Sequence, residues 1–286
     1  MNIMKMNITN TSTLIYTLLL ILICIVLYLI TKYFRKTLTN NKVQKDNLNN
    51  TQSYVLYIPK REKYIKNVMN KIDIDAKYIK GPPKANVDRE QLFKEGMLSK
   101  KYYDMNKKEE KGEVAVFLGH VSILREFLKS NNKYALIFED DIFLPKKEKE
   151  QKEMGKKIKH LIKNIPTEAE MVYFGYCFED CKKAKPYKNN PSLFSHAVVP
   201  VCLHSYLVSR EGARKLLDMI IPLTEGLDVV ILHLIRQKKI NAFTVNKDYL
   251  QVLQNRKDLG SDISNIEHAA DIPVCRIGNW VGNPRR

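Results

Sequence analysis

The chain has 286 residues, of which 44% are hydrophobic, so it can bury the core of one large or two small domains. Its formal net charge of +17 suggests a nucleic-acid partner, but Lys supplies most of that charge, and no Arg-rich stripe with interleaved aromatics is present. The sequence also lacks the glycine-rich motifs of phosphate-loop ATPases and dinucleotide oxidoreductases and the G-x-S-x-G motif of serine hydrolases. A basic nucleic-acid-binding domain is therefore the least favoured class. A basic surface also suits an enzyme whose substrates carry phosphates or that works near anionic lipid.

The N-terminal segment predicts a membrane anchor. No charged residue lies between Met6 and Thr31, and this apolar stretch covers the ~20 residues that a bilayer span requires. No cleavage site of small residues follows, which favours an uncleaved anchor over a signal peptide. We expect a short tail at residues 1–12, one transmembrane helix at 13–31 and a polar linker or stem at 32–52.

The side of the membrane stays open at this point. Basic residues are more numerous after the span than before it, which favours a cytosolic C-terminal domain. Sequons such as Asn49-Asn-Thr are common by chance in a chain so rich in Asn, so they do not decide the orientation.

From Ser53 onward, strand-like and helix-like spacings of apolar residues alternate. Strands are predicted at 54–58, 76–79, 134–138, 171–175, 205–208 and 241–245, and helices at 62–72, 113–129, 146–163, 210–221 and 228–237. Residues 84–110 are expected to be rich in loops, and residues 265–286 form a tail without a clear period. Such alternation predicts an α/β domain with a mainly parallel sheet.

Three acidic residues, Glu139, Asp140 and Asp141, follow the apolar run that begins at Tyr134. Because ligands of open α/β sheets bind beyond the carboxyl ends of the strands, these carboxylates are expected to meet a cation there. In an extended segment Glu139 and Asp141 share a face, where they can hold Mg²⁺ or Mn²⁺ together with oxygens of a nucleotide diphosphate. The alternative is that the three residues cap the next turn or helix.

Four further residues carry functional hypotheses, each with a plain structural alternative. Lys60 and Arg61 follow the first strand, where they either reach a phosphate or base or are solvated loop charges. His120 either donates to a sugar or diphosphate or is a satisfied core residue. Asp228, at the start of an apolar helix, is either its N-cap or a base that takes a proton from an acceptor hydroxyl.

The cysteines do not fix a redox compartment. Cys24 lies in the apolar N-terminal run and is interpreted as a small hydrophobe. No pair of C-x-x-C motifs is present, which argues against a structural zinc site. A disulfide from Cys177 competes with free thiols, and the states of Cys181, Cys202 and Cys275 are equally open.

Ordered segments of the chain resemble glycosyltransferase family 25, the group of bacterial lipooligosaccharide galactosyltransferases and collagen hydroxylysine galactosyltransferases. Residues 54–61 (YVLYIPKR) are similar to an opening strand with Asn-Leu-x-x-Arg, 112–123 to Gly-Glu-x-Gly-x-x-x-Ser-His, 135–142 (ALIFEDDI) to Leu-Glu-Asp-Asp-Val, 172–175 (VYFG) to Ile-Tyr-Leu-Gly, and 205–217 to Ala-Tyr-x-x-Ser-x-x-Gly-Ala-x-Lys-Leu. Asp228 stands where that family has a downstream Asp. The chain departs from the pattern at Ile58-Pro59, where Asn-Leu is usual, and at Gly119, where Ser is usual.

The resemblance spans residues 54–264 and implies a GT-A type fold, with a Rossmann-like mixed sheet flanked by helices, over residues 53–264. It also implies a UDP-sugar donor, Mn²⁺ or Mg²⁺, and transfer with inversion at the anomeric carbon. The implied roles are Asp228 as base, Asp141 and Glu139 at the metal, and Lys60, Arg61, His120, Glu139 and Asp140 at the nucleotide sugar.

These implications together predict a membrane-anchored transferase that moves galactose or glucose to a hydroxyl. The acceptor is either a glycan or glycolipid or the hydroxylysine of a collagen-like protein. The alternative function is a transferase-like binding protein that has lost turnover.

Overall fold

The computed structural model describes residues 16, 18–33, 46–105 and 110–259 of the chain. They belong to two compact units, residues 1–46 and 47–286. The tails expected at 1–12 and 265–286 lie outside the described residues, and so do residues 34–45 of the expected linker.

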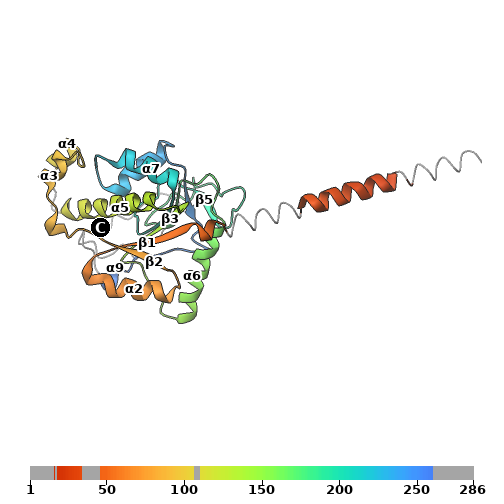
Figure 1. Cartoon of the computed structure of the whole chain (residues 1–286), viewed down its shortest axis with the longest axis horizontal. Coiled ribbons are helices and arrows are strands. Elements are labelled where there is room, and N and C mark those ends of the chain that lie inside the picture. The colour runs from red at the N-terminus through yellow and green to blue at the C-terminus, as the bar shows by residue number, and fades with distance from the viewer. Residues whose placement is uncertain (1–15, 17, 34–45, 106–109, 260–286) are drawn as a thin grey trace, which may run out of the picture. The chain divides into compact units, whose positions relative to one another are not determined.

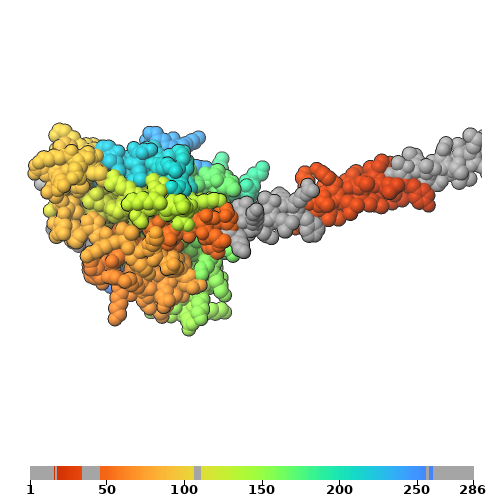
Figure 2. Space-filling view, in the orientation of Figure 1, coloured from red at the N-terminus to blue at the C-terminus, as the bar shows by residue number. Residues whose placement is uncertain are grey.

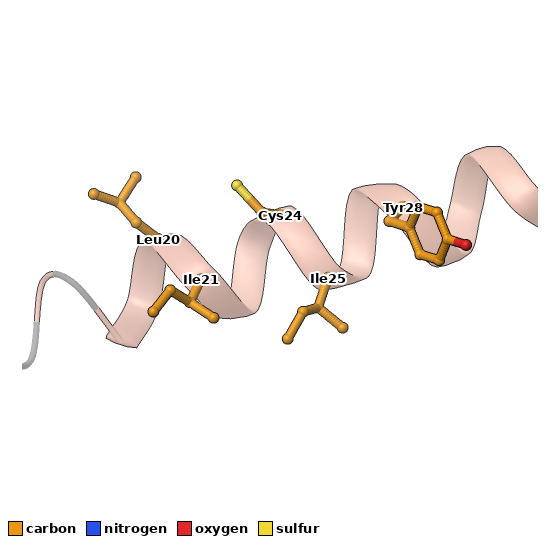
Figure 3. A pocket seen from close by; sticks show the side chains of 5 residues that line it. All are labelled: Leu20, Ile21, Cys24, Ile25 and Tyr28. Carbon is orange, nitrogen blue, oxygen red and sulfur yellow. The ribbon is translucent and has the colours of Figure 1, made fainter.

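In the first unit, residues 18–33 form a helix with exposed apolar side chains. Figure 3 shows five side chains that project from it, those of Leu20, Ile21, Cys24, Ile25 and Tyr28. Within the described ranges, no helix combines the length and the apolar character that crossing a bilayer requires. The anchor expected at 13–31 includes residues 13–15 and 17, which are not among those described.

The second unit contains a seven-stranded sheet with the order β2-β1-β3-β6-β4-β7-β5. Its strands are β1 (Thr51–Tyr57), β2 (Ala76–Lys80), β3 (Tyr134–Glu139), β4 (Met171–Gly175), β5 (Phe194–His196), β6 (Ser205–Ser209) and β7 (Ala242–Val245). This unit begins at Asn47 and β1 at Thr51, slightly before the start expected at Ser53.

The sheet is mixed, as the resemblance implied, and it departs at β6 and β5 from the mainly parallel sheet expected from strand–helix alternation. β1 is parallel to β2 and β3, and β4 is parallel to β7. β6, however, is antiparallel to both β3 and β4, and β5 is antiparallel to β7. A parallel return needs a crossover, which is usually a helix, whereas residues 176–204 between β4 and β6 contain no helix.

Helices cover both faces of the sheet. Their bounds are η1 (Pro59–Arg61), α2 (Glu62–Lys71), η2 (Lys84–Asn86), α3 (Arg89–Lys94), α4 (Lys100–Asp104), α5 (Glu110–Lys129), α6 (Glu148–Lys163), α7 (Arg210–Ile220), α8 (Leu227–Arg236) and α9 (Arg256–Leu259). In Figure 1, α5 and α7 lie on one side of the strands, and α2 and α6 lie on the other.

Two apolar cores follow from this layering. Along β1, Tyr54 and Leu56 belong to the core that contains α5, α7 and α8, whereas Val55 belongs to the core of α2 and α6. Successive side chains of a strand point to opposite faces, so a strand buried between two helical layers must be apolar throughout. Burial of both faces therefore explains the short uninterrupted apolar runs from which the strands were predicted.

The segment 84–110, expected to be rich in loops, contains the short helices α3 and α4. Each begins at a side-chain cap, because Asp88 accepts from the N–H of Gln91 and Ser99 accepts from the N–H of Tyr102. The Tyr102 hydroxyl donates to Glu113 of α5 over 2.8 Å. Figure 2 shows α3 and α4 (yellow) as one corner of the surface of this unit, next to α5.

Candidate active site

The acidic residues lie where β3 ends, and each contacts a different segment of the chain. Glu139 is the last residue of β3, and Asp140 and Asp141 lie in the turn that follows. The next helix, α6, has Lys147 at its N-cap position, so none of the three caps it. They therefore join separate parts of the fold at the carboxyl edge of the sheet.

Asp140 and Arg61, both expected at the nucleotide, form a buried ion pair with each other. Arg61 Nη1 donates to Asp140 Oδ1 over 3.0 Å, and the N–H of Ile58 donates to Asp140 Oδ2 over 2.7 Å. Burial raises the pKa of Asp140, and the Ile58 N–H and the Arg61 guanidinium oppose that shift. The pair fixes the turn between β1 and α2. Lys60 is exposed in that turn, and a nucleotide contact of Lys60 or Arg61 stays a prediction.

Glu139 is oriented by a buried histidine. His120 is fully buried on α5, with Nε2 lying 3.2 Å from Glu139 Oε1 and Nδ1 lying 3.1 Å from the Tyr206 hydroxyl. Burial raises the pKa of Tyr206, and the charge of Glu139 adds to that shift, so the hydroxyl keeps its proton. His120 is thus both a satisfied core residue and a partner of the acidic cluster. The sequence did not single out Tyr206 as its second partner.

Asp141 contacts the last described segment of the chain. Its carboxylate oxygens lie 3.4 and 3.3 Å from the amide nitrogen of Gln254, and its carbonyl accepts from the N–H of Asn255. The Asn255 side chain donates to the Tyr64 hydroxyl, which in turn donates to the carbonyl of Ile142. Residues 254–255 therefore brace the turn that carries Asp141. Sequence reasoning missed them because the stretch has neither a period nor a motif.

The donor set at the end of β3 fits a hard divalent cation. Glu139 and Asp141 offer carboxylate oxygens, the ligands that Mg²⁺ and Mn²⁺ prefer, and both come from one strand end. The Glu139 side chain is 20% exposed, so a substrate phosphate can approach it. Asp140 differs from these two, because the positive charge of Arg61 already neutralises its carboxylate. Metal binding by Glu139 and Asp141 is consistent with this chemistry and stays a prediction.

Asp228 is not the N-cap of α8, since that position is Gly226. Asp228 is the second residue of the helix, and its Oδ1 accepts from the N–H of Val229 over 2.9 Å. Its Oδ2 accepts from the N–H of Cys202 over 3.2 Å, a residue of the connection before β6. Burial raises the pKa of Tyr173 on β4, and the negative charge of Asp228 is the next largest cause of that rise.

A three-residue segment joins Asp228 to the acidic cluster. The N–H of Cys202 contacts Asp228, and the carbonyl of His204 accepts from the N–H of Glu139 over 2.9 Å. Three residues span at most about 11 Å. The structure therefore brings Asp228, Glu139 and His120 to one region of the sheet edge.

The two departures from the family pattern have local explanations. At Gly119, an added Cβ would lie 2.5 Å from Leu56 Cδ1, so glycine lets α5 approach β1 closely. At Ile58, the contact with Asp140 is made by the backbone N–H, so it does not depend on an Asn side chain. Both substitutions thus leave the acidic cluster in place.

Cys177 and Cys202 form a disulfide with a Cα–Cα distance of 5.6 Å. In the described part of the chain, one group of three atoms of metal-ligand type lies within 4.8 Å, and it consists of these two sulfurs and a nitrogen of His204. Because both sulfurs are bonded to each other, neither is available as a thiolate ligand. The sequence left this pairing open, since Cys spacing alone does not determine connectivity.

Comparison with known proteins identifies the family of the chain. The family model described as "Glycosyltransferase family 25 (LPS biosynthesis protein)" matches residues 56–231, which include the turn after β1, His120, the acidic cluster and Asp228. No curated protein matches the chain.

Proposed function

Because the chain belongs to glycosyltransferase family 25, we propose that it transfers a hexose, galactose or glucose, from a UDP-sugar to an acceptor hydroxyl. The observation that supports this is that Glu139, His120 and Asp228 lie in one region at the carboxyl edge of the sheet. In open α/β sheets this edge is where ligands bind. A nucleotide sugar placed there would have carboxylates on its diphosphate side and a further carboxylate, Asp228, in the same region.

In this proposal Glu139 and Asp141 hold Mn²⁺ or Mg²⁺. The cation, when bound, neutralises the charge that builds on the departing UDP. His120 keeps the Glu139 carboxylate in one orientation through its Nε2, and the Tyr206 hydroxyl fixes the other ring nitrogen. Lys60, in η1 after β1, adds positive charge near the diphosphate.

Asp228 acts as the base in the same proposal. It accepts the proton of the acceptor hydroxyl while that oxygen attacks the anomeric carbon and the bond to UDP breaks. One carboxylate base and direct attack give inversion, with no covalent sugar–enzyme intermediate. The description of the family as LPS biosynthesis proteins favours a glycan or glycolipid acceptor over hydroxylysine.

The test is UDP release by the full-length protein in detergent. With Mn²⁺ and UDP-galactose or UDP-glucose, release should occur, should stop when the metal is chelated, and should be lost in Asp141→Ala. The matched control is Asp104→Ala, which removes an exposed carboxylate of α4 and should keep the activity. If no UDP-sugar gives metal-dependent release while UDP still binds in calorimetry, the protein is a binding protein without turnover.

We also propose that residues 13–31 attach the protein to a membrane. The support is the uncharged stretch from Met6 to Thr31 and the exposed apolar side chains of the helix at 18–33. Full-length protein should stay with membranes during alkaline carbonate extraction. The double variant Leu22→Arg/Ile25→Arg should be released, because each central Arg costs about 2.5–3.5 kcal/mol on insertion. Equal retention of both forms would contradict the anchor.

A further inference from the structure

The connection between β4 and β6 is closed at its base by a covalent bond. Residues 177 and 202 are 25 positions apart and form the disulfide. Next to it, the N–H of Cys177 donates to the carbonyl of Val201 over 2.9 Å, and Phe178 pairs with Val201 in an antiparallel bridge. The backbone on both sides of this closure is therefore held in register.

A buried carboxylate fixes the segment that leads into Cys202. Glu179 is 1% exposed and accepts hydrogen bonds from the N–H groups of Asp180, Val198 and Val199. These bonds tie the start of the connection to its end by a second route.

Cys202 has a backbone φ of 70°, in the left-handed region that residues with a side chain rarely adopt. In this conformation its N–H points to Asp228 Oδ2, at 3.2 Å. The surroundings must impose such a conformation on a residue other than glycine, and the covalent bond to Cys177 is one such constraint on Cys202.

The carboxylate of Asp228 accepts two backbone hydrogen bonds, and they differ in origin. The N–H of Val229 belongs to the same helix, so this bond does not fix Asp228 relative to the rest of the fold. The N–H of Cys202 belongs to another part of the fold and is the contact that fixes the carboxylate relative to the β3 edge. We propose that the Cys177–Cys202 disulfide is a positioning element for Asp228, because it holds Cys202 in the left-handed conformation that directs its N–H at that carboxylate. The catalytic consequence rests on the proposed function.

Two double variants of the full-length protein test this inference. Cys177→Ser/Cys202→Ser removes the disulfide and leaves a residue with a side chain at position 202. Cys177→Ser/Cys202→Gly removes the same bond, but glycine adopts positive φ at no steric cost. Glycine makes the unfolded chain more flexible but relieves the strain of positive φ in the folded one, so these two effects oppose each other in the stability of the second variant.

We expect the Ser/Ser variant to lose about tenfold to a hundredfold in kcat, as a displaced catalytic group does, with the KM for donor nearly unchanged. The Ser/Gly variant should recover most of that loss although it also lacks the disulfide. In an Asp228→Asn background, removing the disulfide should cause little further loss in kcat.

A second readout does not depend on turnover. Hydrogen exchange of the residue 202 amide should be slow in the wild type, faster in the Ser/Ser variant, slower again in the Ser/Gly variant, and fast in Asp228→Ala. The inference is overturned if the Ser/Ser variant keeps both the kcat and the amide protection of the wild type, or if glycine restores neither. If the exchange pattern holds but the wild type releases no UDP from any donor, the proposed function fails and the positioning role stands.

Discussion

The guanidinium of Arg61 lies 3.0 Å from the carboxylate of Asp140, and both side chains are only 8% exposed. A buried ion pair of this kind is weak evidence for net stability, because desolvation of the two charges offsets much of their attraction. Loss of one partner is different, since it leaves the other charge buried without compensation. The pair also joins the turns after β1 and β3, the two turns from which most of the candidate site is built.

Arg61→Met should therefore lower the free energy of unfolding by about 3–5 kcal/mol. Adding Asp140→Asn should restore part of that loss, because Asn removes the unpaired charge and keeps an acceptor for the Ile58 N–H. Urea unfolding of the two variants measures the difference. The exposed pair Lys100–Asp104 is the matched control, and the corresponding changes there should have little effect. A double variant no more stable than Arg61→Met would argue against the pair as described.

His120→Ala should lower the affinity of the site for its metal ion. Groups that orient a metal ligand typically contribute tenfold to a hundredfold in metal affinity, so we expect the Mn²⁺ concentration for half-maximal UDP release to rise by about that factor. Tyr206→Phe removes the other partner of His120 but leaves its contact with Glu139, so its effect should be several-fold smaller. The measurement is a Mn²⁺ titration at fixed donor. Equal shifts in the two variants would mean that His120 does not act through Glu139.

Gly119→Ser, which restores the residue usual in the family pattern, should destabilise this chain by about 1–3 kcal/mol through overpacking. The reason is the side chain of Leu56, which lies where the new Cβ would be. In a Leu56→Ala background the same serine should cost clearly less, and thermal unfolding of the four proteins of this cycle gives the coupling. Strictly additive effects would show that α5 shifts away from β1 instead.

Glu179 should make stability depend on pH. Burial raises its pKa above the ordinary value of 4.5, and the three backbone N–H groups reverse this only in part. The folded state then binds this proton more tightly than the unfolded chain does. The stability linked to Glu179 is thus fully present below about pH 4.5 and is lost as the pH rises through the raised pKa.

The variant Glu179→Gln is uncharged at every pH and isolates this effect. The difference in free energy of unfolding, wild type minus variant, should fall as the pH rises above 4.5 and then level off. Urea unfolding at a series of pH values measures it. A difference that does not change with pH would show that the Glu179 pKa is the same in the folded and unfolded states.

Much of the fold could be predicted because the buried strands leave a local signal. β4 is found at Met171–Gly175, where the uninterrupted apolar run placed it. The direction of β6 could not be predicted, because it depends on the connection 176–204, whose polar residues carry no period. The short helices α3 and α4 were missed for a related reason, since with six and five residues they are too short to show an apolar period, and they begin at the caps Asp88 and Ser99.

In the candidate site too, local sequence patterns predicted some features and not others. Residue types and spacing identified Glu139, His120 and Asp228, which the structure brings to one edge of the sheet. Sequence reasoning paired Arg61 and Asp140 with a nucleotide, whereas the structure pairs them with each other. Such a partner is chosen by the packing of segments 79 positions apart, and no local pattern records it.

The disulfide between Cys177 and Cys202 also bears on the compartment in which the domain folds. Disulfides persist in secretory, periplasmic and extracellular compartments, and thiol reductants keep them rare in the cytosol. We therefore expect the domain that begins at Asn47 to mature on the oxidising side of a membrane, the opposite of what the basic residues after the N-terminal segment favour. Protein made by a route that supplies an oxidant should thus be the active form, with the exposed Asn49 of its sequon on the same side as the transferase.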